Sequence, residues 1–192
     1  MSVELARSTV EAHLGRRSAS GVALPSIFEE KRGVFVTLRK RHLGSEALRG
    51  CIGFPYPVRR LAEAIQAASI AAASEDLRFS PVKEDELASI VFEVSVLSRP
   101  SSIDSEPRSN LPSMLRKGKD GLMISNNKAS GLLLPQVATE FGMDQARFLS
   151  QVCVKAGLSP DEWLDRSTKI QTFQAEVFSE RTPNGEIVRT QE

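Results

Sequence analysis

The sequence is poor in the side chains that bind metals and move protons in most enzyme sites. Its 192 residues include two histidines and two cysteines, and neither pair has the His-x-x-x-His or Cys-x-x-Cys spacing of a metal site. A dinucleotide fingerprint and a phosphate-binding loop are missing too. We therefore expect no metal and no cofactor, and any chemistry must come from other residue types.

An excess of charge of one sign is also missing. The 25 basic and 24 acidic residues leave a formal net charge of +1, which gives no general attraction to nucleic acid or to an anionic membrane. A single tryptophan and a single tyrosine provide little surface for base stacking. One local basic cluster, from Arg39 to His42, remains, and we expect it to lie in a solvated hairpin loop.

Long apolar segments and a disulfide framework are absent as well. The most apolar helical stretch, residues 64–73, is too short to span a bilayer, and the N-terminus shows no apolar signal-peptide core. The two cysteines, Cys51 and Cys153, lie about a hundred residues apart, which suits a reducing compartment. We expect a soluble, cytoplasmic protein.

The composition and periodicity that are present are those of an ordinary globular domain. Apolar residues make up 41% and charged residues 26%, and a chain of this size buries about 70% of its unfolded surface. The clearest strand is residues 90–97, with apolar side chains on both faces. We predict further strands over residues 33–39, 48–54, 121–125, 131–134 and 170–178, and helices over residues 3–14, 58–72, 135–141 and 144–156. A short helical turn is expected after Ser80.

The order of these elements repeats along the chain. Residues 33–98 and residues 121–179 each predict strand, strand, helix and strand, and Gly50 and Gly131 occupy similar places before the two helices. Such units predict an α+β fold, with a mainly antiparallel sheet and helices packed on it. We expect one domain over residues 1–192, ending in a polar tail over residues 181–192.

The stretch of residues 48–55 carries the strongest chemical signal. As a strand, it places Arg49 and Cys51 on one face, roughly 7 Å apart at the backbone. A nearby guanidinium favours the thiolate form of a cysteine, so Cys51 is a candidate nucleophile or redox centre, with Arg49 as its activator or as an anion clamp. Gly50 and Gly53 would let a ligand or another backbone approach closely.

A structural reading of the same residues stays open. Cys51 would then fill a space in which a larger side chain would clash, and Arg49 would pair with Glu93 or Asp76. Glu93, on the clearest strand, is either a carboxylate of the site or part of a structural ion pair. Cys153, on the inner side of a predicted helix, is most simply a small apolar core residue.

Several motifs occur in the order typical of one protein family. They are Leu48-Arg49-Gly50-Cys51-Ile52-Gly53, Glu75-Asp76 with Arg78-Phe79, Glu93 to Ser98, Ser130 to Val137, and Cys153 to Leu158. From about residue 20 to residue 180, the sequence resembles the AMMECR-type domain family, named for the Alport-syndrome, midface-hypoplasia and elliptocytosis chromosomal region.

The resemblance implies an α+β fold with a larger and a smaller lobe and a cleft between them. It also implies that the motif with Arg49 and Cys51 is the functional site. The candidate ligand-binding residues are Gly50, Gly53, Arg78, Glu93, Ser130 and Gly131. By family association, a Memo-type protein or a radical-SAM enzyme is the expected kind of protein partner.

Two functions from different classes follow. The first is an enzyme or small-ligand-handling protein with a cleft site at Arg49 and Cys51. A catalytic base for such an enzyme is not evident, because neither histidine, His13 or His42, belongs to a matching motif. The second is a non-catalytic binding or adaptor module for a protein partner. Nucleic-acid binding through the basic cluster is a weaker third reading.

Overall fold

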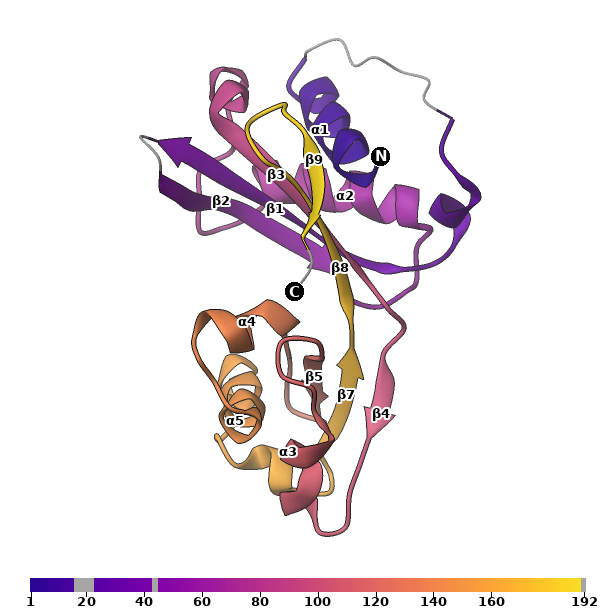
Figure 1. Ribbon diagram of the computed structural model, residues 1–192, viewed down its shortest axis with the longest axis vertical. Helices are drawn as coiled ribbons and strands as arrows, with labels where there is room; N and C mark the ends of the chain where they lie inside the picture. Colours follow the sequence, from indigo (N-terminus) through magenta and orange to yellow (C-terminus); the bar gives the residue numbers. More distant parts are fainter. Residues whose placement is uncertain (16–22, 43–44, 191–192) are drawn as a thin grey trace. The chain divides into compact units, whose positions relative to one another are not determined.

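The chain folds into two units, each with its own sheet (Figure 1). The structure is a computed structural model that describes residues 1–15, 23–42 and 45–190. The first unit holds residues 1–97 and the C-terminal strands, and the second unit holds residues 98–175. The predicted α+β class is confirmed, but the strands form two sheets where the repeat predicted one.

The first sheet has five strands in the order β2-β1-β3-β8-β9. The central part is antiparallel, since β1 pairs with β2 on one side and with β3 on the other, and β9 pairs antiparallel with β8. The bounds are β1 Gly33–His42, β2 Ser45–Phe54, β3 Ile90–Leu97, β8 Ala175–Glu180 and β9 Ile187–Thr190. β2 and β9 are therefore the edge strands.

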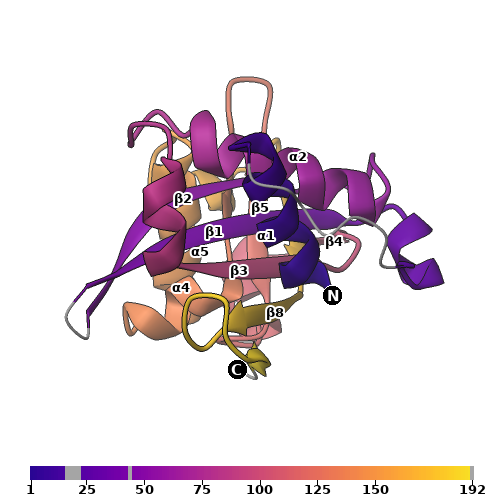
Figure 2. The same ribbon diagram turned by 90° about the horizontal axis from the view of Figure 1, so that it is seen from above.

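Two helices cover one face of the first sheet (Figure 2). They are α1 Ser2–His13 and α2 Leu61–Ser74, and the short 3₁₀ helix η1 Ser26–Glu29 lies between them in the chain. Val34, Val36 and Leu38 of β1 pack against these helices and are fully buried. Because side chains alternate along a strand, Phe35 and Thr37 face the other side. Burying a large apolar side chain stabilises the folded state by about 1.5–3 kcal/mol. The face of β1 and β2 that packs on the helices therefore belongs to the core, and a site can lie only on the opposite face.

Helix α2 begins later than the sequence predicts. Its first residue is Leu61, so Val58 lies outside the helix and is 66% exposed. The entry to the helix is extended instead, because Arg60 forms a β-bridge with Lys31. The Leu61 N–H donates to the Glu30 carbonyl oxygen at 2.8 Å, and this bond sets the start of the helix.

Two predicted turns also differ from the structure. The short helical turn expected after Ser80 and toward Leu87 begins later than predicted, as the 3₁₀ helix η2 Glu84–Ser89. The hairpin loop predicted over residues 39–45 is shorter, because β1 includes the whole basic cluster up to His42. Its tip, residues 43–44, lies outside the described residues. The basic cluster is therefore part of a strand.

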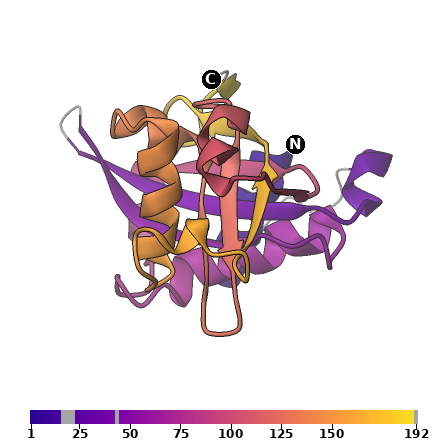
Figure 3. The ribbon, with the colours of Figure 1, turned by 90° about the horizontal axis from the view of Figure 1, so that it is seen from below.

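The second sheet has four strands in the order β4-β7-β5-β6. Their bounds are β4 Ser101–Ile103, β5 Gly121–Ser125, β6 Ser130–Leu133 and β7 Lys169–Phe173. The helical segments of this unit are η3 Arg108–Asn110, α3 Leu111–Met114, α4 Pro135–Glu140, α5 Gln145–Lys155 and η4 Glu162–Leu164. α5 packs on β5 and β6 (Figure 3), and Cys153 is fully buried in the core between them, as predicted.

The two units share a strand order but not the limits that the repeat predicted. β1 lies between β2 and β3, as β5 lies between β6 and β7. The single strand predicted over residues 170–178 is two strands, β7 and β8, in different sheets. They separate at Gln174, which exchanges two hydrogen bonds of 2.9 Å with Ser98. Residues 181–192, expected as a polar tail, contain β9.

A buried ion pair fixes the first helix to the C-terminal part of the first unit. Arg7 on α1 donates two hydrogen bonds of 2.6 Å to the carboxylate of Glu180 on β8 and one of 2.7 Å to the Ile90 carbonyl oxygen. Glu180 also accepts from the Phe92 N–H at 3.0 Å. Within the described residues, no helix combines the length and the apolar character needed to cross a bilayer.

Candidate functional site

Arg49 and Cys51 lie on β2, but a bulge separates them. Leu38 of β1 pairs with Gly50 and Arg39 pairs with Leu48, so Arg49 has no partner in the register. An extra residue on one strand breaks the alternation of side chains and bends the strand. The alternation was the basis for placing Arg49 and Cys51 as neighbours on one face, and the bulge removes that basis.

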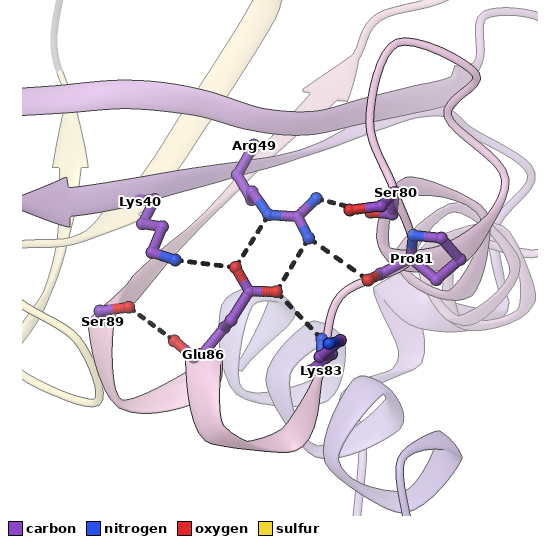
Figure 4. A network of polar contacts seen from close by, with 7 residues as sticks. All are labelled: Lys40, Arg49, Ser80, Pro81, Lys83, Glu86 and Ser89. Atoms are coloured by element: carbon purple, nitrogen blue, oxygen red, sulfur yellow. Dashed lines mark hydrogen bonds and ion pairs between the residues drawn. The ribbon is translucent and has the colours of Figure 1, made fainter.

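The Arg49 side chain is held by Glu86, as Figure 4 shows. Its Nε and Nη2 donate to the two carboxylate oxygens of Glu86 at 3.2 and 2.8 Å. Nη1 donates to the Ser80 carbonyl oxygen at 2.9 Å, and Nη2 also donates to that of Pro81 at 3.3 Å. The side chain is only 12% exposed. The partner of Arg49 is therefore Glu86, and not Glu93 or Asp76 as the structural reading predicted.

Glu86 is the centre of this network. Besides Arg49, it accepts from Lys40 Nζ at 2.8 Å and from the Lys83 N–H at 3.1 Å. The hydrogen bonds from Arg49, more than any other cause, lower the pKa of Glu86 to about 2. Glu86 thus stays charged at every physiological pH, and the guanidinium of Arg49 is engaged in fixing the segment between α2 and β3.

Cys51 lies on the face of the sheet opposite α1 and α2. Its Sγ accepts a hydrogen bond from Thr37 Oγ1 at 3.3 Å. Thr37 is the register partner of Cys51 on one side and of Glu93 on the other, so the three side chains form a row across β2, β1 and β3. Paired residues on adjacent strands are about 5 Å apart. This row, Cys51–Thr37–Glu93, places a thiol, a hydroxyl and a carboxylate on neighbouring strands of that face.

Burial, rather than a neighbouring cation, has the largest effect on the pKa of the Cys51 thiol. Burial raises the pKa of Cys51, and the charges of Glu93 and Asp76 act in the same direction. The hydrogen bond from Thr37 and the charge of Arg78 lower the pKa but do not offset the effect of burial. The thiol is therefore protonated at neutral pH, and the cation that acts on it is Arg78 rather than Arg49.

The backbone of Cys51 is held by two side chains of the segment after α2. Its N–H donates to Asp76 Oδ2 at 2.8 Å, and its carbonyl oxygen accepts from Arg78 Nη2 at 3.3 Å. Asp76 and Arg78 also bind each other through hydrogen bonds of 2.9 and 2.6 Å. The bonds from Arg78 keep the pKa of the buried Asp76 carboxyl far below its usual range. The backbone of Cys51 is thus held by an ion pair that stays charged at physiological pH.

The rest of this face is a mixture of polar and aromatic groups. Arg39 Nε lies 4.0 Å from a carboxylate oxygen of Glu93, whose side chain is 15% exposed. Two residues further along β3, the Ser95 hydroxyl is buried without a hydrogen-bond partner among the described residues. In the register, Ser95 lies opposite Phe35. Such an unsatisfied hydroxyl is uncommon in a folded protein.

The glycines of the motif serve packing between parts of the protein. A Cβ on Gly50 would lie 2.1 Å from the Ala72 carbonyl oxygen, so Gly50 permits the close approach of α2. A Cβ on Gly53 would lie 2.3 Å from the ring of Phe35. Of the two readings left open for these residues, close approach of other protein groups is the one that the geometry supports.

The remaining candidates lie in the second unit. Ser130 and Gly131 begin β6. A Cβ on Gly131 would lie 2.8 Å from the Cβ of Ala156 at the end of α5, so this glycine also permits close packing. Among the predicted site residues, the structure brings Arg78 and Glu93 close enough to Cys51 for their charges to act on the pKa of its thiol. Arg49 belongs to the neighbouring network of Glu86.

Two residues of the arrangement, Thr37 and Glu86, were missed by sequence reasoning. Glu86 is 37 residues from Arg49 in the chain, and no local pattern links the two. Thr37 lies on a predicted strand, but its position beside Cys51 depends on the hairpin register, which the bulge shifts by one residue. Without the bulge, the same hairpin would have placed Thr37 opposite Gly50.

The basic cluster is largely neutralised by acids. Lys40 pairs with Glu86 at 2.8 Å, and Arg41 lies 3.3 Å from Glu46. With Arg39 near Glu93, the three long cations each have a carboxylate partner, which disfavours phosphate binding. No group of three or more His, Cys, Asp and Glu side chains suited to a metal ion is found among residues 1–15, 23–42 and 45–190.

The chain is similar to one family of proteins over almost its whole length. The profile of the AMMECR1 family matches residues 3–178. A protein of Thermococcus onnurineus is 48% identical, covering 97% of this chain and 92% of that protein, and a protein of Methanosarcina mazei is 46% identical, covering 97% and 94%. The crystal structure of the uncharacterized protein PH0010 from Pyrococcus horikoshii matches with a TM-score of 0.91 at 44% identity, over 100% of this chain and 95% of that one.

Proposed function

This chain belongs to the AMMECR1 family, and from that premise and the geometry at Cys51 we propose that it is a small-ligand-handling protein. The site is the row Cys51–Thr37–Glu93 on the face of the first sheet opposite α1 and α2. The observation that carries the proposal is the hydrogen bond from Thr37 to the Cys51 thiol, beside a carboxylate in the next strand.

In this site the thiol is a neutral polar group rather than a thiolate nucleophile. Burial raises its pKa, and the nearest charged groups are carboxylates as well as a cation. The Ser95 hydroxyl on the same face, buried and without a partner among the described residues, offers a further hydrogen bond to a bound polar molecule. A ligand held by hydroxyl, thiol and carboxylate groups is polar and small.

A thermal-shift screen against metabolite mixtures tests the proposal. A ligand at a hundredfold excess over its Kd stabilises the folded state by about 2.7 kcal/mol, which raises Tm by several degrees. We expect Thr37→Val, which keeps the shape but removes the hydroxyl, to abolish that shift. The matched control Thr172→Val, on β7 of the second unit, should leave it intact. Hits that survive in Thr37→Val, or the absence of any hit, would overturn the proposal.

A second candidate function is docking of a protein partner, and one side chain favours it. Leu77 is completely exposed, with a relative exposure of 101%, between Asp76 and Arg78, which are both fixed to β2. An apolar side chain on a rigid loop suits an anchor that enters a pocket of a partner. The partner expected from family association is a Memo-type protein or a radical-SAM enzyme.

Calorimetry with a purified Memo-type protein distinguishes this candidate. Leu77→Asp should weaken the association at least tenfold, as expected for an anchor worth about 1.4 kcal/mol or more. Leu164→Asp, at an exposed position on η4 of the second unit, is the matched control. Equal binding by both variants would remove Leu77 as the anchor.

A cytoplasmic location is proposed on the state of the two cysteines. Cys51 and Cys153 are both free thiols, and unpaired cysteines in a folded domain suit a reducing compartment. Fractionation of the source cells, followed by detection of the chain, tests this assignment. Recovery with the membrane or external fraction would contradict it.

A further inference from the structure

Strand β2 is an edge strand whose outer side is closed by side chains rather than by another strand. It lies at one end of the order β2-β1-β3-β8-β9. Edge strands present unpaired N–H and C=O groups on which another chain can add a strand. At Cys51 both groups are already occupied, by the Asp76 carboxylate at 2.8 Å and by the Arg78 guanidinium at 3.3 Å.

Asp76 and Arg78 thus reproduce what a neighbouring strand would offer. In an antiparallel pair, a residue donates its N–H and accepts at its C=O from the same partner residue. Here the acceptor is a carboxylate and the donor is a guanidinium, and the two bind each other at 2.6 Å. The Asp76 side chain is 5% exposed, so water competes little with the bond that it accepts from the Cys51 N–H.

A second attachment holds the same segment along the edge. Arg49, at the bulge, donates to the carbonyl oxygens of Ser80 and Pro81 at 2.9 and 3.3 Å. The Val82 N–H donates back to the Ala73 carbonyl oxygen at 2.7 Å. Residues 75–82, which we call the strap, are therefore fixed beside β2 at both ends.

We propose that the strap is an edge guard, in which Asp76, Arg78 and Arg49 keep β2 closed to antiparallel pairing with the β2 strand of a second copy of this chain. With a two-fold axis at Cys51 the paired segment is residues 48–54 (Leu-Arg-Gly-Cys-Ile-Gly-Phe), which contains no proline and has Arg49, already bound to the strap, as its one charged residue. A two-fold axis at Cys51 makes the pairing self-complementary, since both copies offer the same N–H and C=O.

The chemistry of this pairing gives a specific readout. Across an antiparallel, hydrogen-bonded pair the two Cα atoms lie about 5.5 Å apart, within the range in which two cysteines form a disulfide. Under a mild oxidant such as copper–phenanthroline, two Cys51 thiols lose two protons and two electrons to the oxidant and form one S–S bond between the copies. Cys153 is fully buried and does not compete.

The test compares the protein with a variant whose strap is released, Arg49→Ala/Asp76→Ala. We expect this variant to change from monomer to dimer with rising concentration in light-scattering chromatography, and to form a Cys51 disulfide dimer under oxidant. The unchanged protein and the matched control Arg32→Ala/Glu75→Ala should form neither. Adding Cys51→Ser to the released variant should remove the cross-link and leave the dimer.

A folded variant that stays monomeric, or one that associates without the Cys51 cross-link, would overturn the proposal. If the double variant does not fold, hydrogen exchange of the single variant Arg78→Ala decides, because that side chain is 56% exposed. The Cys51 N–H still donates to Asp76 in this variant, but Asp76 no longer has Arg78 to hold it. The Cys51 N–H should therefore exchange about tenfold faster. An unchanged rate would count against the edge guard.

Discussion

At the scale of single residues, the cation that acts on Cys51 is not the one that the sequence predicted. The guanidinium expected beside the thiol, that of Arg49, is bound to Glu86, and the cation that acts on Cys51 belongs to Arg78. The bulge at Arg49 explains the difference, because it ends the strict alternation of β2. The motif therefore combines a structural cation with a neutral thiol.

Glu86→Gln should destabilise the fold by about 2–3 kcal/mol at pH 7, because two cations and one N–H lose their charged acceptor. The pKa of Glu86 is lowered from 4.5 to about 2 in the folded state. Its charged form therefore adds stability above pH 4.5, and this stability is lost as the pH falls toward 2. Urea unfolding of both proteins at several pH values measures the effect.

The gap between the protein and Glu86→Gln should narrow steadily between pH 4.5 and pH 2.5, within the window set by the lowered pKa. Glu75→Gln, at the exposed first residue of the strap, is the control and should unfold like the unchanged protein. A gap that is the same at pH 7 and pH 3 would mean that the charge of Glu86 does not support the network.

At the scale of elements, the contact of α2 with β2 depends on the absence of one side chain. A Cβ on Gly50 would lie 2.1 Å from the carbonyl oxygen and 3.1 Å from the carbonyl carbon of Ala72. Both are backbone atoms of a helix, which cannot turn away as a side chain can. The helix would have to shift as a whole, and the layer that buries Val36 and Leu38 would loosen.

Gly50→Ala should therefore lower the free energy of unfolding by about 1–3 kcal/mol, the usual cost of overpacking. Denaturant unfolding followed by circular dichroism measures the loss. Ala47→Val, which adds methyl groups at an exposed position of the same strand, is the matched control and should have little effect. A neutral Gly50→Ala would show that α2 does not need this close approach.

Strongly patterned elements could be predicted from the sequence, while pairings across the chain could not. β3 has the predicted limits, and α1 differs by one residue at each end. The predicted start of α2 was wrong, because a β-bridge between Arg60 and Lys31 overrides the local periodicity. The prediction of a single strand over residues 170–178 was wrong, because Gln174 exchanges hydrogen bonds with Ser98 and separates β7 from β8. Such tertiary bonds leave no local signal.

At the scale of the whole molecule, the first unit is closed by residues from both ends of the chain. Arg7 and Glu180 are separated by 173 positions, and both side chains are at most 8% exposed. The Arg7 guanidinium also lies 4.5 Å from the Phe92 ring centroid. Removing Arg7 leaves the Glu180 charge buried without a cation, and removing Glu180 leaves the buried Arg7 with the more distant Glu11 alone.

Arg7→Met and Glu180→Gln should each destabilise the protein by about 3–5 kcal/mol. The double variant should cost less than the sum of the two, because it leaves no unpaired charge. Glu11→Gln, at a more exposed position 3.7 Å from Arg7, serves as the control in the same urea titrations. Additive losses in the double variant would show that the two side chains do not act as a pair.

The rate of alkylation of Cys51 as a function of pH tests the central claim most directly, which is that the site holds a neutral thiol in a row with Thr37 and Glu93. Cys153 is fully buried, and its pKa is raised to about 11, so the folded protein reacts at Cys51. We predict an apparent pKa above the free-thiol value of about 8.5, raised further in Thr37→Val. An apparent pKa well below that value, and dependent on Arg49, would contradict the account.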